Sequence, residues 1–372
     1  MPALREFARD QLALAEQKGL RRRLVETERR GPGMVRRAGR DLVSFSCNDY
    51  LNLSHHPRVI AAATRTLQHE GAGAGASRLV TGNHPSYIEL ESLLARMKGT
   101  ERALVFSSGY AANVGTIPAL VGREDLVQID RLAHACQWDG ARLSGATVLR
   151  LEHNDVENAC ELLNTHRQSF GRCLILTETV FSMDGDLGPI DELYDLARRH
   201  DAWLMTDDAH GLGLIPPRPA DLQMGTLSKA VGVAGGYVCG PSEVIAYLEN
   251  RARTLMFSTG LPPSCVAAAT EALRIMGEDP GLCARPIANA RRFTTALGRP
   301  PAMSPIVPVV LGEPERAMSA SAMLEENGLL AVAIRPPSVP PGTARLRFAF
   351  SASLQVDDID RAAGLLKEHG HA

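Results

Sequence analysis

The sequence predicts an α/β fold with a mostly parallel sheet and a smaller α+β domain at the C-terminal end. Between residues 102 and 209, short apolar runs alternate with amphipathic segments, which is typical of strands joined by crossover helices. After about residue 275 the pattern changes to Val-, Leu- and Phe-rich strands with helices between them. The 372 residues suffice for a large core. We therefore expect an N-terminal helical segment (1–40), a large domain (41–275) and a small domain (276–372).

The N-terminal part predicts two helices before the alternating region begins. Amphipathic spacing places them at 4–28 and 56–71. The second should end with Gly71 in the left-handed αL conformation, which glycine adopts without steric cost. A turn, a strand and a glycine-rich loop complete this part, at 29–41, 42–53 and 71–87.

The rest of the chain predicts the sheet and the small domain. In the alternating region we expect strands at 102–108, 125–130, 146–153, 172–180 and 202–209. The helices between them are expected at 109–121, 134–145, 156–166 and 190–200. The small domain should contain strands at 305–312, 331–337 and 344–350 and a helix at 316–328.

Charge and composition exclude several classes of function. The 40 basic and 42 acidic side chains almost balance, so nothing favours nucleic acid or an anionic membrane as a partner. No apolar run has membrane-spanning length, and the N-terminus lacks the apolar core of a signal peptide. The seven cysteines are scattered without a CxxC pair, which suits a reducing compartment. We expect a soluble, cytoplasmic protein without a metal site.

A single lysine lies among hydroxyl residues and glycines in TLSKAVGVAGG, residues 226–236. Lys229, if it is kept from bulk water, has a lowered pKa and can form a Schiff base. The alternative is an ordinary surface lysine that extends its ammonium group into water.

Three further stretches contain side chains suited to one flat cofactor. Asp207 and His210 follow a buried strand, where a carboxylate could keep a ring nitrogen protonated, although capping of a helix is an equal alternative. Gly109 lies at a strand–Ser-Ser-Gly–helix junction, which is a phosphate-binding arrangement. His134 follows another strand and could stack on a ring, or serve only as a cap. Together with Lys229, these groups match pyridoxal 5'-phosphate (PLP), which needs its aldehyde, ring nitrogen and phosphate held separately.

Seven stretches of the chain resemble the α-oxoamine synthase family, whose members are fold-type I PLP enzymes that join an amino acid to an acyl thioester. The resemblance covers the chain from about residue 20 to the C-terminus. The stretches are SFSCNDYLNL, GAGASRLVTG, LVFSSGYAAN, ETVFSMDGDLGPI, DDAHGLG, GTLSKAVGVAGG and AIRPPSVPPGTARLR.

The resemblance implies roles for the residues at matching positions. Lys229 would form the Schiff base, Asp207 would face the pyridinium nitrogen, and His210 would bond the phenolic oxygen of PLP. His134 would stack on the ring, and Ser182 would lie beside it. Further cofactor contacts are implied for Gly109, Tyr110, Thr226 and, from the neighbouring subunit of a homodimer, Thr259. Substrate contacts are implied for Arg347 and Asn48 at the amino-acid carboxylate, and for Arg21, Arg335 and Ser338 at the acyl group.

Within the family, residues 333–347 most resemble members that use a dicarboxylic acyl group. Their arginines suit a distal carboxylate, whereas a long apolar chain would leave buried charges unpaired. The implied reaction joins L-alanine to a pimeloyl thioester, yielding 8-amino-7-oxononanoate, CO2 and a free thiol in biotin synthesis. Lys229 would remove the α-proton, and His134 is our candidate for a proton donor to the new carbonyl oxygen.

Other activities remain open at this point. Glycine C-acetyltransferase, 5-aminolevulinate synthase and serine palmitoyltransferase share the cofactor residues and differ mainly in their substrate pockets. A binding module on a degenerate PLP fold would have no need for Lys229. A Rossmann dehydrogenase is disfavoured because GAGAGAS follows a helix-like segment instead of a strand. Asn52, where the family usually has glycine, and a short run between Gly213 and Thr226 are departures from the family pattern.

Overall fold

A seven-stranded sheet organises residues Asn48–Ile287, one of two units in the structure. The structure is a computed structural model that describes residues 2–371. The strands lie in the order β4-β10-β9-β8-β7-β5-β6, and only β10 runs antiparallel to its neighbours. This sheet confirms the predicted α/β class with mostly parallel strands. Its members are β4 (Arg102–Phe106), β5 (Leu126–Asp130), β6 (Thr147–Leu151), β7 (Cys173–Glu178), β8 (Trp203–Asp207), β9 (Leu222–Thr226) and β10 (Gly236–Gly240).

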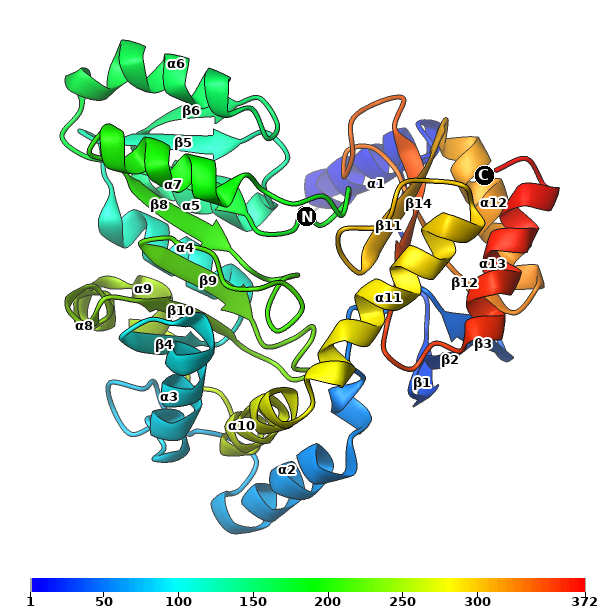
Figure 1. The fold of residues 1–372 in the computed structure, drawn as a ribbon, viewed down its shortest axis with the longest axis horizontal. Coiled ribbons are helices and arrows are strands. Elements are labelled where there is room, and N and C mark those ends of the chain that lie inside the picture. The colour runs from blue at the N-terminus through cyan, green and yellow to red at the C-terminus, as the bar shows by residue number, and fades with distance from the viewer. Residues whose placement is uncertain (1, 372) are drawn as a thin grey trace. The chain divides into compact units, whose positions relative to one another are not determined.

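Helices cover both faces of this sheet (Figure 1) because alternate residues of its strands are apolar on both sides. In β7, Leu174 and Leu176 pack under α4, α5 and α8, whereas Cys173 and Ile175 pack under α6 and α7. The helices of this unit, not all of which lie on the sheet, are α2 (Pro57–Glu70), α3 (Ser86–Lys98), α4 (Gly109–Leu120), α5 (Ala135–Ser144), α6 (Val156–His166), α7 (Ile190–Arg199), α8 (Ser242–Arg251), α9 (Arg253–Met256) and α10 (Pro263–Glu278). Short 3-10 turns are η1 (Leu53–His55) and η2 (Arg167–Ser169).

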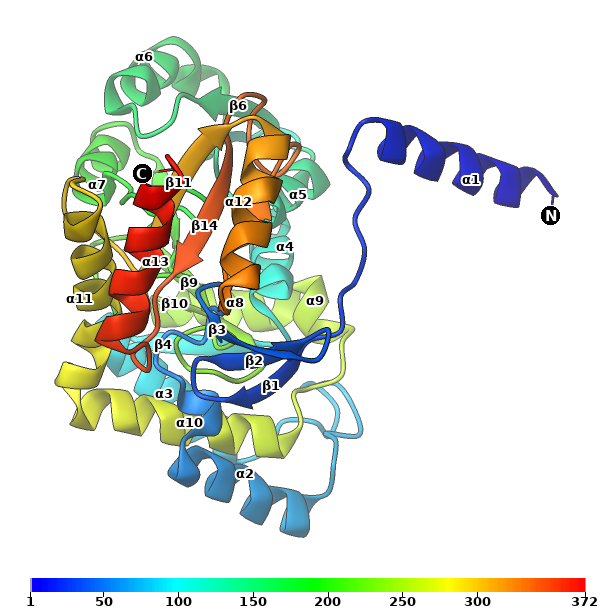
Figure 2. The same ribbon diagram turned by 90° about the vertical axis from the view of Figure 1, so that its right-hand side faces the viewer.

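The second unit joins residues 2–47 to residues 288–371, so the two ends of the chain fold together. A three-stranded antiparallel sheet, in the order β11-β14-β13, packs with α12 and α13 (Figure 2). A second sheet has the order β1-β2-β3-β12. The elements are α1 (Pro2–Gln17), β1 (Glu28–Gly31), β2 (Met34–Arg37), β3 (Arg40–Ser44), α11 (Pro280–Ala296, whose first half belongs to the larger unit), β11 (Ile306–Gly312), α12 (Pro314–Glu326), β12 (Leu329–Leu330), β13 (Val332–Ile334), β14 (Ala344–Ala349) and α13 (Val356–Glu368).

The N-terminal helix is shorter than the sequence predicts. It ends at Gln17 because Gly19 takes a φ of 61°, and the N–H of Leu20 then closes the helix end on the carbonyl of Ala15. The predicted turn at 29–41 is instead a pair of β-hairpins, and the strand predicted at 42–53 ends at Ser44. The arginine-rich strands β1, which is mostly exposed, and β2, which is half-buried, lack the apolar alternation that marks a strand in a sequence.

Gly71 is a smaller correction. It does have a positive φ of 80°, but its ψ of −174° lies outside the predicted αL region. Its N–H still bonds the carbonyl of Leu67, so the helix ends where the sequence predicts.

Four aromatic rings form the centre of the smaller unit. Phe293 is fully buried, with its ring centroid 4.6 Å from that of Phe348 and 5.1 Å from that of Phe350. Phe45 packs edge-on against the same two rings. This cluster joins β-strands from the end of the chain to the segment that follows β3.

We expect Phe293→Ala to destabilise this unit by about 3–5 kcal/mol, since it leaves a cavity among rings that cannot collapse fully. Urea unfolding monitored by circular dichroism measures the loss. Met318→Ala, on the exposed side of α12, is the matched control and should change the free energy of unfolding by less than about 0.5 kcal/mol. Equal effects of the two substitutions would contradict the prediction.

Among the described residues, every helix is too short or too polar to span a lipid bilayer.

Candidate active site

The carboxyl ends of the parallel strands meet at one edge of the large sheet, and a cavity of about 260 Å³ opens there. Because only β10 is reversed, β4, β9, β8, β7 and β5 all deliver the residues that follow them to this edge. Eight of the residues predicted from the sequence line the cavity: Gly109, Tyr110, His134, Ser182, Asp207, His210, Thr226 and Lys229.

The amine of Lys229 lies at the end of a chain of polar contacts. Its Nζ is 2.8 Å from Nε2 of His210, and Nδ1 of His210 is 2.7 Å from the Tyr50 hydroxyl. That hydroxyl donates to Oδ1 of Asn48 (3.3 Å), so its oxygen accepts from Nδ1–H. Nε2 of His210 then presents its lone pair to the amine. Lys229 is therefore directed into the cavity, not into water as the surface alternative requires.

Asp207 is the last residue of β8 and is buried. Its Oδ2 accepts from the side-chain amide of Asn113 (2.8 Å), and its Oδ1 accepts from the backbone N–H of Ala209 (2.9 Å). No helix begins at the residues after it, so Asp207 is not a helix cap. Its carboxylate is held in one orientation at the wall of the cavity.

The start of α4 provides a site for an anion. Ser108 caps this helix by accepting from the N–H of Ala111, while the N–H groups of Gly109 and Tyr110 donate to no acceptor in the described residues. The hydroxyl of Thr226, at the end of β9, lies 2.8 Å from that of Ser228 in the same cavity. A Cβ at Gly109 would approach Cβ of Thr226 to 3.1 Å, so a larger residue would crowd this close packing. The helix dipole and the free N–H groups together favour a phosphate, whereas the Thr226 hydroxyl donates to the carbonyl of Gly235 (2.8 Å).

His134 is both a helix cap and a cavity residue. It precedes α5, and its Nδ1 accepts from the backbone N–H of Cys136 (3.3 Å) and lies 2.8 Å from the Cys136 sulfur. Burial lowers the pKa of His134 and raises that of Cys136 to about 12. The imidazole is therefore neutral with its proton on Nε2, and this N–H is available as a donor.

The remaining predicted residues lie elsewhere in the structure. Thr259 forms an isolated bridge with Ser77 and does not line this cavity. In the smaller unit, Arg21 pairs with Glu16 (2.9 Å), and Arg347 is a buried residue of β14. The other two predicted residues of that unit also have partners there: Arg335 donates to the carbonyl of Gly19 (2.6 Å), and Ser338 accepts from Arg22 (2.8 Å).

Sequence reasoning missed three residues of the site: Tyr50, Asn113 and Glu178. Each belongs to a stretch that carries the resemblance, namely SFSCNDYLNL, LVFSSGYAAN and ETVFSMDGDLGPI, but none was assigned a role. Glu178 ends β7, lines the cavity, and accepts from the backbone N–H of His134 (2.5 Å).

The two departures from the family pattern also have structural explanations. Asn52 adopts the left-handed conformation, with φ 54° and ψ 28°, which asparagine tolerates better than other non-glycine residues. The short run after Gly213 lines a separate, mostly apolar cavity of about 370 Å³ with Met276 and the start of α11. The cofactor-type residues lie in the smaller cavity, not in this one.

A profile of the aminotransferase class I and II family matches residues 40–366. The chain belongs to this family. The match and the relatives below confirm the predicted recognition and the fold-type I class.

Two relatives are similar in sequence to the chain along nearly its whole length. An 8-amino-7-oxononanoate synthase of Methylobacterium nodulans is 54% identical over 372 residues, covering 100% of this chain and 98% of the relative. One of Methylorubrum extorquens is 56% identical over 367 residues, covering 98% of this chain and 96% of the relative.

Solved structures resemble the chain in three dimensions. A lysine-to-alanine variant of serine palmitoyltransferase from S. paucimobilis, with a bound PLP–myriocin aldimine, has a TM-score of 0.89 and 29% identity, covering 97% of this chain and 96% of that one. The 8-amino-7-oxononanoate synthase from Francisella tularensis has a TM-score of 0.76 and 26% identity, covering 88% of this chain and 98% of that one.

We expect Glu178 to be a neutral acid in the folded protein. Burial, reinforced by the negative charge of Asp207, raises the pKa of Glu178 well above its usual range. Glu178→Gln keeps an acceptor for the N–H of His134 and should change the free energy of unfolding by less than about 1 kcal/mol, whereas Glu178→Ala strands that N–H and should cost about 1–3 kcal/mol more. Thermal unfolding of the two variants compares them. Equal losses for Gln and Ala would show that the carboxyl is ionised.

Proposed function

We propose that this chain catalyses the reaction of an 8-amino-7-oxononanoate synthase: it condenses L-alanine with a pimeloyl thioester and releases CO2 and a thiol. The single observation that carries the proposal is 54–56% identity over nearly the whole chain to synthases of that name. The cavity with Lys229, Asp207 and the start of α4 provides the chemistry. The PLP expected from the sequence is confirmed by the family and by the solved relative with bound PLP.

The residues around the cavity fit PLP. The N–H groups of Gly109 and Tyr110 suit its phosphate, and the fixed carboxylate of Asp207 suits its protonated ring nitrogen. Thr226 lines the same cavity, but its hydroxyl donates to the carbonyl of Gly235 (2.8 Å). The amine of Lys229 suits its aldehyde. When bound, PLP supplies an electron sink that stabilises negative charge at the amino-acid α-carbon.

Lys229 and His210 handle the first proton in our proposal. Lys229 Nζ takes the proton from the α-carbon of alanine, and His210 orients this amine through the 2.8 Å contact. Tyr50 and Asn48 fix the tautomer of His210 in turn, so the lone pair at Nε2 stays directed to the amine.

The bonds that change are those of the two substrates. The α-carbon forms a bond to the acyl carbon while the thioester C–S bond breaks, and the bond to the carboxylate then breaks with loss of CO2. The α-carbon regains a proton at the end. We propose that His134 donates its Nε2–H to the ketone oxygen during these steps, since its Nδ1 is occupied as an acceptor.

Several predicted assignments remain proposals that depend on the resemblance. They are the substrate contacts of Arg21, Asn48, Arg335, Ser338 and Arg347, the role of Ser182 beside the ring, and a homodimer in which Thr259 reaches the phosphate of the neighbouring subunit. A cytoplasmic location is proposed on the same basis. Sedimentation of the PLP-loaded protein tests the dimer directly.

A sister activity is the second candidate, because the serine palmitoyltransferase of S. paucimobilis has a TM-score of 0.89 to this chain. The arginines within 333–347 favour an acyl group with a distal carboxylate over a long apolar chain. The two candidates therefore differ in the acyl group and the amino acid, while they share the cofactor chemistry.

A product assay by mass spectrometry separates them. The PLP-loaded protein receives alanine, glycine or serine, each with pimeloyl, acetyl, succinyl or palmitoyl thioester. We expect the pair of alanine and pimeloyl thioester to exceed every other pair by at least about tenfold in kcat/KM. A dominant product from serine and the palmitoyl thioester would replace the proposal with the sister activity. No product from any pair would overturn both.

A further inference from the structure

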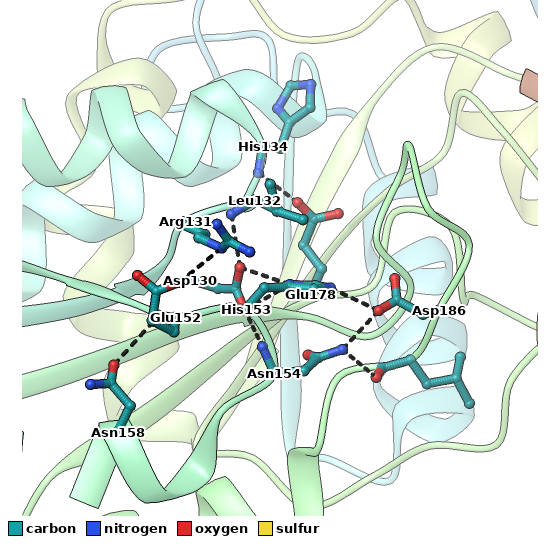
Figure 3. A network of polar contacts seen from close by, with 11 residues as sticks. Asp130, Arg131, Leu132, His134, Glu152, His153, Asn154, Asn158, Glu178 and Asp186 are labelled. Carbon is teal, nitrogen blue, oxygen red and sulfur yellow. Dashed lines mark hydrogen bonds and ion pairs between the residues drawn. The ribbon is translucent and has the colours of Figure 1, made fainter. Parts of the chain in front are cut away.

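His153 lies between two carboxylates in the larger unit (Figure 3). Its Nδ1 is 3.0 and 3.1 Å from the two oxygens of Asp130, and its Nε2 is 2.8 Å from Oδ2 of Asp186. An ionised carboxylate only accepts hydrogen bonds, so each ring nitrogen must carry a hydrogen. The ring is therefore an imidazolium bound on both sides.

The first carboxylate shapes the turn that leads to His134. Asp130 ends β5, and it also accepts the backbone N–H of Leu132 (2.8 Å) and that of Asn154 (2.9 Å). His134 follows Leu132 by two residues and reaches the cavity. The contact with His153 thus fixes a carboxylate on which this turn depends.

The second carboxylate belongs to the turn that contains Ser182. The backbone carbonyl of Asp186 accepts the N–H of Phe181 (3.0 Å), directly before Ser182. The Phe181 ring meets the His153 ring edge-on, at 4.5 Å between centroids. Asn154 adds a contact of its own, donating to Oδ2 of Asp186 (2.9 Å). One side chain therefore contacts two turns, each of which delivers a residue to the cavity.

The surroundings of His153 favour its charged form. The side chain of His153 is 16% exposed and that of Asp130 4%, so water competes weakly for this contact, whereas Asp186 is 35% exposed and partly solvated. Of the other charged groups on these loops, Arg131 and Glu152 pair with each other at 3.3 Å, Asp155 accepts from the backbone N–H of Asn158 (2.8 Å), and Asp184 lies on the turn between Ser182 and Asp186. Burial opposes protonation, but the hydrogen bonds to both carboxylates outweigh it and raise the pKa of His153 to about 10.

We propose that His153 is a positioning residue that, as a permanent imidazolium between Asp130 and Asp186, fixes the turns of His134 and Ser182 against the bound PLP. This rests on the proposed function only in taking the cavity as the PLP site. His153 thereby has a positioning role in this function, although it does not line the cavity itself.

The first test is a mutant cycle with PLP affinity as its readout. Affinity is measured by titrating the apoprotein with PLP and following the visible circular dichroism of the bound cofactor. In the otherwise wild-type protein, we expect His153→Gln to raise the Kd of PLP about tenfold and to change the dichroism. In a protein that already carries His134→Ala and Ser182→Ala, the same substitution should raise Kd less than about threefold. A similar rise in both backgrounds would overturn the proposal, since His153 would then act only through general stability.

Asp186→Ala covers the case in which His153→Gln does not fold, because this carboxylate is partly exposed and Asp130 stays in place. It should weaken PLP in a His134→Ala background and have no effect in a Ser182→Ala background. The opposite pattern would overturn the proposal. His84→Gln is the matched control, since His84 also contacts a carboxylate, Glu70 (3.2 Å), outside the cavity, and should leave Kd unchanged.

The charge of the ring can be measured separately. In ¹⁵N NMR of histidine-labelled protein at a pH of about 8, where an ordinary imidazole is neutral, His153 should show two protonated nitrogens. A neutral His153 would overturn the imidazolium. These readouts need no acyl substrate, so failure of the product assay alone would remove the proposed function and leave the role of His153 intact.

Discussion

Lys229→Ala is expected to lower kcat by at least about 10³-fold, because in the proposed mechanism one amine both holds PLP and moves the α-proton. The contact of its Nζ with Nε2 of His210 (2.8 Å) directs this amine into the cavity. The variant should also lose the visible absorbance of a cofactor bound to lysine. Single-turnover kinetics and an absorbance spectrum of the PLP-loaded protein measure the two effects.

Lys367→Ala is the matched control for this substitution. Lys367 lies in the last turn of α13 and is exposed, so its removal should leave both the spectrum and kcat unchanged. If Lys229→Ala retained activity within about tenfold of the wild type, the lysine would not be the base and the proposed chemistry would fail.

Asp207→Asn is expected to lower kcat by about 10²–10³-fold while PLP still binds. Asparagine keeps the size of the side chain but removes the negative charge that favours a protonated ring nitrogen. The carboxylate of Asp207 has two oxygens that can accept hydrogen bonds, whereas an asparagine side chain has one. The side-chain amide of Asn113, which donates to this position, therefore restricts how the new side chain can be oriented. Rate measurements with alanine, together with the spectrum of bound PLP, test this.

The matched control is the same substitution at an aspartate outside the cavity, where kcat should not change. Asp201 is 98% exposed in its side chain and has a φ of 48°, which asparagine also tolerates. Asp201→Asn should leave kcat unchanged. A normal rate in Asp207→Asn would show that the cofactor does not need a charged partner at its ring nitrogen.

The sequence predicts the large sheet well where apolar runs alternate with amphipathic helices, as in β5 to β8. It misses β9 and β10, whose sequences LQMGT and GYVCG are short and lack both periodicity and a run of branched residues. These strands are stabilised by their pairing within the sheet, a non-local contact that no local pattern contains.

In the candidate site, too, residues within distinctive local stretches can be predicted, whereas residues that act through non-local contacts cannot. Lys229, Asp207, His210 and His134 belong to conspicuous stretches and could be found from the sequence. Glu178 and Tyr50 could not, because each acts through a partner that is distant along the chain: His134 for Glu178, and His210 for Tyr50. A carboxyl group whose pKa is raised by burial, as for Glu178, can be recognised only once the fold has surrounded it.

The reversed strand β10 has a consequence for the lysine itself. Lys229 lies on a loop that leaves the sheet at Thr226 and returns at Gly236, where a Cβ would overlap the backbone of Ser108 and Gly109. The backbone N–H of Leu227 donates to the carbonyl of Gly235 (2.9 Å) and closes this loop at its base. A short, closed tether gives the amine a high effective concentration at its target, of the kind that reaches about 10⁵–10⁸ M in well-oriented intramolecular reactions. If Lys229 holds the cofactor as proposed, this tether lets it rejoin the cofactor after each product leaves without a search.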